Sequence, residues 1–270
     1  MASWWTISVP VERRSIDLNA DLGEADDDAG RAIERGLLGL VSSAHIACGG
    51  HAGDDESMRA IVQAALRAGV RVGAHPSYPD RAGFGRRPMA MAASDLASSL
   101  ADQIGALIKV AASLGASVCS VKPHGALYGE VGGHAGTFDA LVGVVVDLCD
   151  PGTALVLPAG APALTWAEKA GLAVLEEGFA DRAYTSDGRL LDRRQPGSVY
   201  NDPEQAAAQA LGLAQWGTVR AADGTTLTLA VDTLCLHGDS PNALAMARAV
   251  RRGLSDAGIA VAAPPAPRPA

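Results

Sequence analysis

The sequence of 270 residues is poor in aromatic side chains, which make up 4% of it, although 48% of its residues are hydrophobic. Alanine and the branched aliphatic residues must therefore fill the core. No apolar run approaches the roughly 18 residues that a membrane-spanning helix needs. Residues 1–11 also lack the basic and then apolar layout of a signal peptide. We therefore expect a cytoplasmic protein with no membrane partner.

Several signature motifs are missing as well. The sequence has no G-x-S-x-G nucleophile elbow, no Walker G-x-x-x-x-G-K-[ST] loop and no H-E-x-x-H zinc helix. An excess of positive charge is missing too, because the formal net charge is -8. Nucleic acid is therefore not an expected partner, since gripping its phosphates needs clustered Lys and Arg. A nucleotide site must be unconventional or shared with another chain.

The cysteines form no C-x-x-C pair. Three of them lie in apolar contexts, which predicts buried, inert thiols. Cys48 is the exception, because its glycine-rich surroundings allow an exposed thiol.

Short apolar runs alternate with helical patterns along the whole chain. We expect strands at 15–22, 41–47, 70–74, 118–121, 153–157, 172–175 and 226–236, with a last short one at 259–261. Alternating strands and helices predict a parallel sheet with right-handed crossovers. No glycine-rich dinucleotide turn follows the first strand, which favours a closed or nearly closed α/β barrel over an open sheet. The length suits one such domain at 15–263, between an N-terminal extension at 1–14 and a disordered proline-rich tail at 264–270.

Capping signals mark the ends of several helices. The expected N-caps are Asp54, Ser94, Asp202 before Pro203, and Ser240 before Pro241, and Gly69 is an expected stop. Residues 176–202 look irregular. The Pro-, Gly- and Arg-rich stretch that runs to Pro88 is too long for a simple connection and suggests a functional lid.

Polar clusters follow most of the predicted strands. They are Asp17, Asn19 and Asp21; His45 and His51; His75; Lys122 and His124; Asp181 and Arg182; and His237 and Asp239. The carboxyl ends of barrel strands converge on one mouth, so these segments can share a single site. The recurrence predicts an enzyme.

The types of side chain suggest roles. Asp17, Asn19 and Asp21 lie on one side of a strand and can hold a cation, position a water or divide acid and base work; the alternative is that they cap a helix or pair with arginines. His45 and His51 lack the i, i+4 spacing of a helical zinc pair, which leaves metal binding open.

Lys122 is the most reactive-looking residue. A desolvated lysine loses its proton more readily or stabilises an oxyanion, whereas the alternative is an ion pair with Asp17 or Asp21. Arg182, Arg189 and Arg193 are suited to clamping a carboxylate, and the arginines of the long loop to recognising an anion.

Six strings together resemble the LamB/YcsF family, whose members include the A subunit of bacterial 5-oxoprolinase. They are I-D-L-N-A-D-L-G-E, I-A-C-G-G-H-A-G-D, G-A-H-P-S-Y-P-D-R-A-G-F-G-R-R, V-K-P-H-G-A-L-Y, G-F-A-D-R-A-Y and C-L-H-G-D-S-P. The sequence departs from the family pattern at His45, Gly50 and Gly129, where asparagine, phenylalanine and asparagine are common.

The resemblance implies a single seven-stranded (β/α)7 TIM-like barrel similar to the carbohydrate deacetylases. It also implies ATP-dependent opening of 5-oxoproline to glutamate, with subunits B and C as partners. The expected catalytic residues are Asp17, Asp21, His51, His75, Lys122 and His124. The expected substrate-binding residues are Asn19, His45, Asp181, Arg182, His237 and Asp239. Two alternatives stay open: a metal-dependent deacetylase or amidohydrolase that uses a divalent metal, and a non-catalytic substrate-binding subunit.

Overall fold

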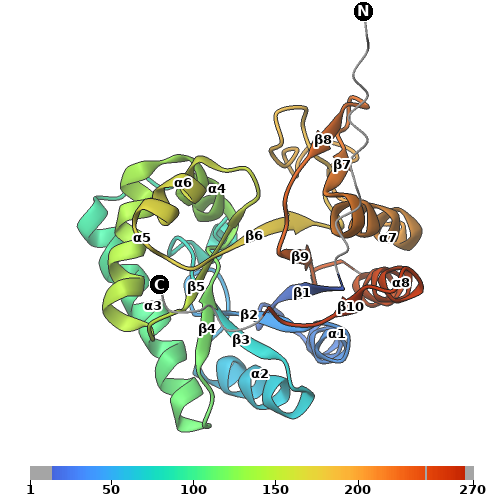
Figure 1. The fold of residues 1–270 in the computed structure, drawn as a ribbon. Helices are drawn as coiled ribbons and strands as arrows, with labels where there is room; N and C mark the ends of the chain where they lie inside the picture. The colour runs from blue at the N-terminus through green and yellow to red at the C-terminus, as the bar shows by residue number, and fades with distance from the viewer. Residues whose placement is uncertain (1–13, 241, 265–270) are drawn as a thin grey trace, which may run out of the picture.

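The structure is a computed structural model that describes residues 14–240 and 242–264. A closed barrel of parallel strands lies at its centre (Figure 1). The barrel strands are β1 (Ser15–Leu22), β2 (Ser43–Ala47), β3 (Arg71–His75), β4 (Val118–Val121), β5 (Ala154–Pro158), β6 (Val174–Phe179) and β9 (Thr233–Leu236). Each strand pairs with the next, and β9 closes the ring by pairing with both β6 and β1. The predicted seven-stranded barrel is confirmed.

Helices surround the barrel (Figure 1). They are α1 (Asp28–Leu38), α2 (Asp55–Ala68), α3 (Ala93–Ser113), α4 (Gly125–Gly133), α5 (Ala135–Leu148), α6 (Pro162–Lys169), α7 (Pro203–Leu211) and α8 (Ala243–Asp256). Short elements complete the fold: the turns η1 (Arg81–Gly83) and η2 (Gly212–Trp216), the antiparallel pair β7 (Thr218–Arg220) and β8 (Thr226–Thr228), and β10 (Ala260–Val261) beside the start of β1.

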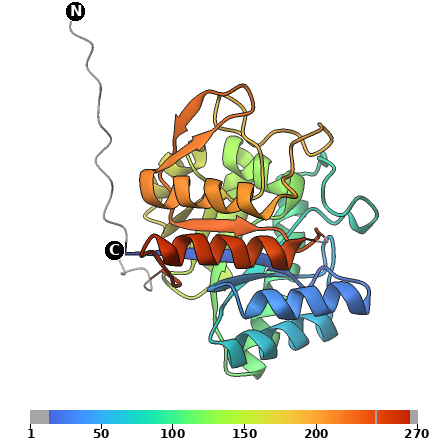
Figure 2. The same cartoon turned by 90° about the vertical axis from the view of Figure 1, so that its right-hand side faces the viewer.

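The apolar core lies between the barrel and the helices. Leu18 and Leu22 of β1 and Ile46 of β2 are fully buried, in the same cluster as Leu37 of α1 and Val62 of α2. Successive side chains of a strand point to opposite faces, so the alternate positions point into the barrel. The loops after β3 and β6 extend from the same end of the barrel (Figure 2), where the predicted polar clusters lie.

Two of the predicted caps are confirmed. Asp54 and Ser57 form a reciprocal capping box at the start of α2, and Gly69 ends that helix with a left-handed φ of 68°. Asp202 caps α7 by accepting a hydrogen bond from the Glu204 amide.

The other two predicted caps are wrong. Ala92 precedes α3, so Ser94 lies within its first turn. Asn242 precedes α8, and the Ser240 hydroxyl accepts a hydrogen bond from the Asn242 amide. Pro241 lies outside the described residues.

The chain also differs from the predicted pattern around β6 and β9. The strand predicted at 226–236 splits into β8 and β9, because Leu229 still bonds to Gly217 beside the β7–β8 pair whereas Asp232 already bonds to Glu176 of β6. The segment predicted as irregular from residue 176 begins with the second half of β6. Helix α4 was not predicted.

No single helix in the described part of the chain has the length and apolar character to cross a membrane, although α4 and α5 meet that criterion together as a pair bent by 107°. The predicted extension and tail fall outside the described residues except for residues 14 and 264, and they stay predictions.

Candidate active site

Polar side chains from strands that are not neighbours meet inside the barrel. Asn19 of β1 donates to Glu177 of β6 at 2.9 Å, and His45 of β2 lies 3.1 Å from the Ser120 hydroxyl of β4. Between these last two, β3 carries Gly73, where a Cβ atom would lie 2.5 Å from the His45 ring. Glycine is therefore what lets His45 reach across to β4.

Lys122 lies at the centre of one group of polar residues, which we call the lysine half. The Lys122 Nζ atom lies 2.8 Å from a carboxylate oxygen of Asp21, 2.8 Å from one of Glu177 and 3.1 Å from the side-chain Oδ1 atom of Asn19. The Tyr128 hydroxyl donates to the other Glu177 oxygen at 2.6 Å. Lys122 Nζ also lies 3.2 Å from the Cys235 sulfur, so the lysine half comprises Asn19, Asp21, Lys122, Tyr128, Glu177 and Cys235.

The charges of the lysine half are matched. Burial alone would lower the pKa of Lys122, but Asp21 and Glu177 raise it well above its usual value. Burial likewise opposes the charge of Asp21, yet His75 and Lys122 hold its pKa well below the usual range. The expectation that burial frees Lys122 of its proton is therefore wrong; it is an ammonium ion paired with Asp21.

A second group, which we call the histidine half, consists of Glu24, His51, His75 and His124. The Glu24 Oε1 atom lies 2.8 Å from His51 Nε2, 3.7 Å from His75 Nε2 and 3.3 Å from His124 Nδ1. His75 Nε2 lies 3.0 Å from His124 Nδ1. Donor atoms of all four residues lie within 4.8 Å of one another, so the group can hold a metal ion.

Burial keeps much of the histidine half uncharged. It raises the pKa of Glu24 to about 7, to which repulsion by Asp21 contributes. It lowers the pKa of His51 to about 4 and that of His124 well below the usual value. The neutral His51 ring has no partner for its buried Nδ1 atom among the described residues. That nitrogen is free to accept a proton from a bound water.

The predicted lid, which follows His75 and runs to Pro88, packs on the histidines. The Phe84 ring contacts the rings of His51 and His124 edge-on, with centroids 5.2 and 5.3 Å apart. Phe84 has a left-handed φ of 54°, a strained conformation for a residue other than glycine. Asp239 pairs with Arg86 of the lid at 2.8 Å and with Arg193 of the loop after β6 at 2.6 Å, and so joins the two loops.

His237 lies nearer the surface than the other histidines of the site. Asp181 holds it by accepting from its backbone amide and facing its Nδ1 atom, both at 3.0 Å. The His237 side chain is 16% exposed, whereas that of His75 is 1% exposed. Because it stacks on Phe179 and keeps its Nε2 edge away from Asp181, His237 is suited to contacting a substrate.

Arg182 and Asp17 lie apart from these groups. The Arg182 guanidinium donates to the backbone carbonyls of Ser198 and Leu191, so it supports the loop after β6 instead of clamping a carboxylate. Asp17 lies four residues before Asp21, about 13 Å along the strand. It accepts from Ser42, Ser43 and Thr233 and touches neither half directly. The structure therefore places Asp17 beneath the site.

A sequence model described as the LamB/YcsF family matches residues 16–268. The chain belongs to the LamB/YcsF family. It is 48% identical over 250 residues to the 5-oxoprolinase A subunit of Methylococcus capsulatus, covering 93% of this chain and 96% of that protein. It is also 48% identical over 255 residues to the 5-oxoprolinase A subunit of Mycobacterium avium, covering 92% and 98%. Among solved structures, a "Lactam Utilization Protein" from Thermus thermophilus superposes with a TM-score of 0.84 at 42% identity, covering 92% of this chain and 99% of that one.

Two of the departures from the LamB/YcsF pattern have different surroundings. A Cβ atom at Gly50 would collide with the side chains of Ser77 and Gln103. The Gln103 side chain is itself hydrogen-bonded to the backbone amide and carbonyl of Ser77. This packing leaves no room for a side chain at Gly50. At Gly129 of α4 nothing lies within 4 Å of such an atom.

Four residues of the two halves were not predicted from the sequence as site residues: Glu24, Tyr128, Glu177 and Cys235. Glu24 ends the string D-L-G-E directly after β1, and Tyr128 ends V-K-P-H-G-A-L-Y. Both residues lie in motifs that carry the family resemblance, and that signal could have identified them. Glu177 was hidden in the segment predicted as irregular. Cys48 is not an exposed thiol: its Sγ atom lies 3.0 Å from the Ile46 carbonyl oxygen, and burial raises its pKa to about 12.

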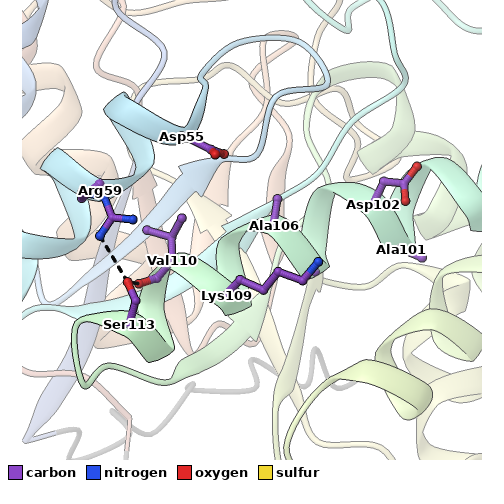
Figure 3. A pocket seen from close by; sticks show the side chains of 9 residues that line it. Asp55, Arg59, Ala101, Asp102, Ala106, Lys109, Val110 and Ser113 are labelled. Carbon is purple, nitrogen blue, oxygen red and sulfur yellow. Dashed lines mark hydrogen bonds between the residues drawn. The ribbon is translucent and has the colours of Figure 1, made fainter.

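A separate hollow of about 380 Å³ lies among the outer helices, between α2 and α3 (Figure 3). It is lined by side chains of mixed charge, including Asp55, Arg59, Asp102 and Lys109, and Arg59 donates to Ser113 at 3.2 Å. None of the predicted site residues lines it, so the chemistry belongs to the barrel interior.

Proposed function

We propose that this chain is the A subunit of an ATP-dependent 5-oxoprolinase, which opens the lactam of 5-oxo-L-proline to L-glutamate together with subunits B and C. The observation that carries the proposal is the 48% identity, over almost the whole chain, to relatives named as A subunits of 5-oxoprolinase. The name of the Thermus thermophilus protein, which refers to lactam utilisation, agrees with it.

The lactam oxygen lies next to Lys122 in this proposal. A five-membered lactam resists hydrolysis because its amide resonance must be broken, so coupling to ATP is chemically sensible. The oxygen takes the γ-phosphoryl group of ATP, and ADP leaves. Water then adds to the carbonyl carbon and the ring C–N bond breaks with a proton going to nitrogen, which gives γ-glutamyl phosphate. A second water hydrolyses this acyl phosphate to glutamate and phosphate. The ammonium of Lys122 offsets the negative charge that develops on the oxygen.

His51 activates the water in this proposal. Its Nε2–H donates to Glu24 at 2.8 Å, which fixes the tautomer and leaves Nδ1 as a base. The neutral state of the ring, which follows from its lowered pKa, makes Nδ1 available over the whole physiological range. His75, His124 and Asp21 position these groups.

Arg86 and Arg193 bind the ring carboxylate of the substrate. Both now pair with the carboxylate of Asp239, at 2.8 and 2.6 Å, and a substrate carboxylate can take the same place. His237, held by Asp181, lies on the same rim. The chain has no Walker loop, so we assign the ATP site to an unconventional pocket shared with subunits B and C; a divalent metal is a further proposed cofactor.

The test is a coupled ATP-hydrolysis assay with 5-oxoproline, run on this chain alone and on the chain reconstituted with subunits B and C. We expect glutamate and phosphate in equal amounts from the complex. Lys122→Ala and His51→Ala should lower the turnover by at least about 100-fold. His134→Ala, which changes an exposed histidine between α4 and α5, is the matched control.

Other outcomes would replace the proposal. Near-normal turnover by folded Lys122→Ala and His51→Ala would discard the roles given to these residues. Release of acetate from acetylated sugars without ATP, abolished by a chelator, would favour a metal-dependent deacetylase, which the histidine half makes the second candidate. Tight binding of 5-oxoproline by calorimetry, with full turnover by subunits B and C carrying a folded Lys122→Ala chain, would favour a substrate-binding subunit.

A further inference from the structure

We propose that Glu24, His75 and His124 form a binding site for a divalent transition-metal ion, of the kind that zinc fills. The inference does not depend on the lactam, because a binding measurement can succeed where the oxoprolinase assay fails. It rests on three observations: the spacing of the donor atoms, the direction of their lone pairs, and the orientation of the His51 ring.

The three donor atoms have the spacing of ligands around one ion. Zinc bonds of about 2.0–2.1 Å in a tetrahedron place neighbouring ligand atoms about 3.3 Å apart. The three edges of the triangle measure 3.0 Å between the two histidine nitrogens, 3.3 Å from His124 Nδ1 to Glu24 Oε1, and 3.7 Å from His75 Nε2 to Glu24 Oε1. The edges therefore fall on both sides of the expected spacing.

The lone pairs of both histidines point into the triangle. His75 Nδ1 lies 2.8 Å from the Lys122 carbonyl oxygen, and His124 Nε2 lies 2.9 Å from the Phe84 carbonyl oxygen. A carbonyl only accepts, so each of these outer nitrogens carries the hydrogen. When both rings are neutral, their inner nitrogens are acceptors that face each other and Glu24, and His75 Nε2 also lies 3.3 Å from the carboxylate of Asp21.

This arrangement of acceptors is unfavourable unless a metal cation or a proton lies between them. Buried acceptors that face one another carry a desolvation cost that a cation removes. Histidine ligands of metals also donate their outer N–H to a carbonyl or carboxylate, as His75 and His124 both do. The competing occupant is a proton, which would convert one ring to imidazolium and donate to the other.

His51 is not a ligand in this proposal, although it lies close to the triangle. Its ring stacks on that of His124 with centroids 3.7 Å apart and planes inclined by 6°. An ion bonded along the lone pair of one ring lies in that ring's plane, and two parallel planes cannot both contain it. His51 instead donates to Glu24 at 2.8 Å. Three protein ligands leave a coordination position for water or substrate, as in catalytic zinc sites.

A second group of possible ligands does not compete. Asp21, Cys235 and His237 also offer donor atoms close together. However, the Lys122 ammonium lies 2.8 Å from Asp21 and 3.2 Å from the Cys235 sulfur, and it would repel a metal ion there.

The test is calorimetric titration of the full chain with Zn²⁺ after chelator treatment, with elemental analysis of the desalted product. We expect about one zinc ion per chain, and binding weakened at least about tenfold in Glu24→Gln and His124→Asn. His134→Ala, at an exposed histidine, should bind like the unchanged chain. Far-UV circular dichroism establishes that each variant is folded, and both ligand substitutions keep the size of the original side chain so that the fold is disturbed little.

Two results would overturn the site. The first is no stoichiometric zinc on the folded chain, which would leave a proton as the occupant of the triangle. The second is stoichiometric zinc that folded Glu24→Gln and His124→Asn bind as tightly as the unchanged chain, which would put the ion elsewhere. A tenfold loss in both variants, without a loss in His134→Ala, supports it.

Discussion

The lysine half and the histidine half of the site lie side by side but differ in how their charges are balanced. In the lysine half one ammonium is shared between two carboxylates, and Tyr128 supplies a further donor to Glu177. In the histidine half, possible acceptor atoms of Glu24, His75 and His124 lie 3.0–3.7 Å from one another. Apart from Glu24, whose side chain is 12% exposed, the residues of both halves are buried, so exposure does not explain the difference.

The comparison indicates that the two halves have different roles. A buried charge that is fully paired contributes to a single well-defined arrangement, whereas a buried group with unmatched acceptors is what a ligand, metal or reacting proton completes. Substitutions in the lysine half are therefore expected to lower mainly the stability of the fold. Substitutions in the histidine half are expected to weaken mainly ligand binding and catalysis. The following predictions test that difference, in order of decreasing effect.

The largest effect is expected from Lys122→Met. The change removes the cation between Asp21 and Glu177 and leaves two buried carboxylates facing each other. Breaking a buried pair in this way costs about 3–5 kcal/mol in the free energy of unfolding. Urea unfolding at neutral pH measures it. Lys109→Met, at an exposed lysine of α3, is the control and should change the value by less than about 0.5 kcal/mol. An equally small change in Lys122→Met would show that the lysine half is not a matched unit.

The matched pair Asp21→Asn and Glu24→Gln compares the two halves directly. Because Lys122 and His75 favour the charge of Asp21, its loss should cost about 2–3 kcal/mol at neutral pH. Glu24→Gln should cost less than about 1 kcal/mol in the presence of a chelator, since an amide also brings an N–H donor to the facing nitrogens. Urea unfolding of both variants decides it. A larger loss in Glu24→Gln than in Asp21→Asn would reverse the comparison.

The sequence predicted several residues of both halves and missed others. His51, His75, Lys122 and His124 were all found, because each follows an apolar run and the carboxyl ends of barrel strands converge. Glu177 was missed since adjacent glutamates in V-L-E-E-G-F are untypical of a strand; only closure of the barrel buries one of them. The pairing of β6 with β5 and β9 makes this segment a strand, and no local sequence pattern indicates that pairing.

Roles were harder to predict than positions. The sequence placed Asp17 and Asp21 on one side of β1, but it did not show their partners: Asp17 accepts from Ser42, Ser43 and Thr233, whereas Asp21 pairs with Lys122. Arg182 was predicted to clamp a carboxylate, whereas carbonyls of the loop after β6 use its donors. Such assignments depend on which partners tertiary structure brings near, and not on residue type.

Tyr128→Phe tests whether donors in the lysine half matter individually. The variant leaves the Glu177 Oε2 atom without the 2.6 Å hydrogen bond and should cost about 1–2 kcal/mol. Tyr200→Phe is the control, because its hydroxyl makes only a 3.3 Å contact with Gln209. Urea unfolding of the two variants side by side should show the larger loss for Tyr128→Phe. Equal losses would mean that Glu177 is adequately satisfied by Lys122 and Asn19.

The smallest effect is expected outside both halves, at the N-cap of α2. Asp54→Ala removes the acceptor for the Ser57 amide and should cost about 1 kcal/mol. The Ser57 bonds lower the pKa of Asp54, so its contribution is present above the unfolded value of 3.8 and is lost as the pH falls through the lower folded value. Unfolding measured at pH 7 and near pH 3 should show the cost shrinking, with Asp55→Ala as a control that leaves the cap intact. Zinc should stabilise Asp54→Ala as much as the unchanged chain, because the cap lies outside the metal triangle. A zinc effect that vanished with Asp54 would show that α2 and the histidine half are coupled and that the site is not confined to the barrel mouth.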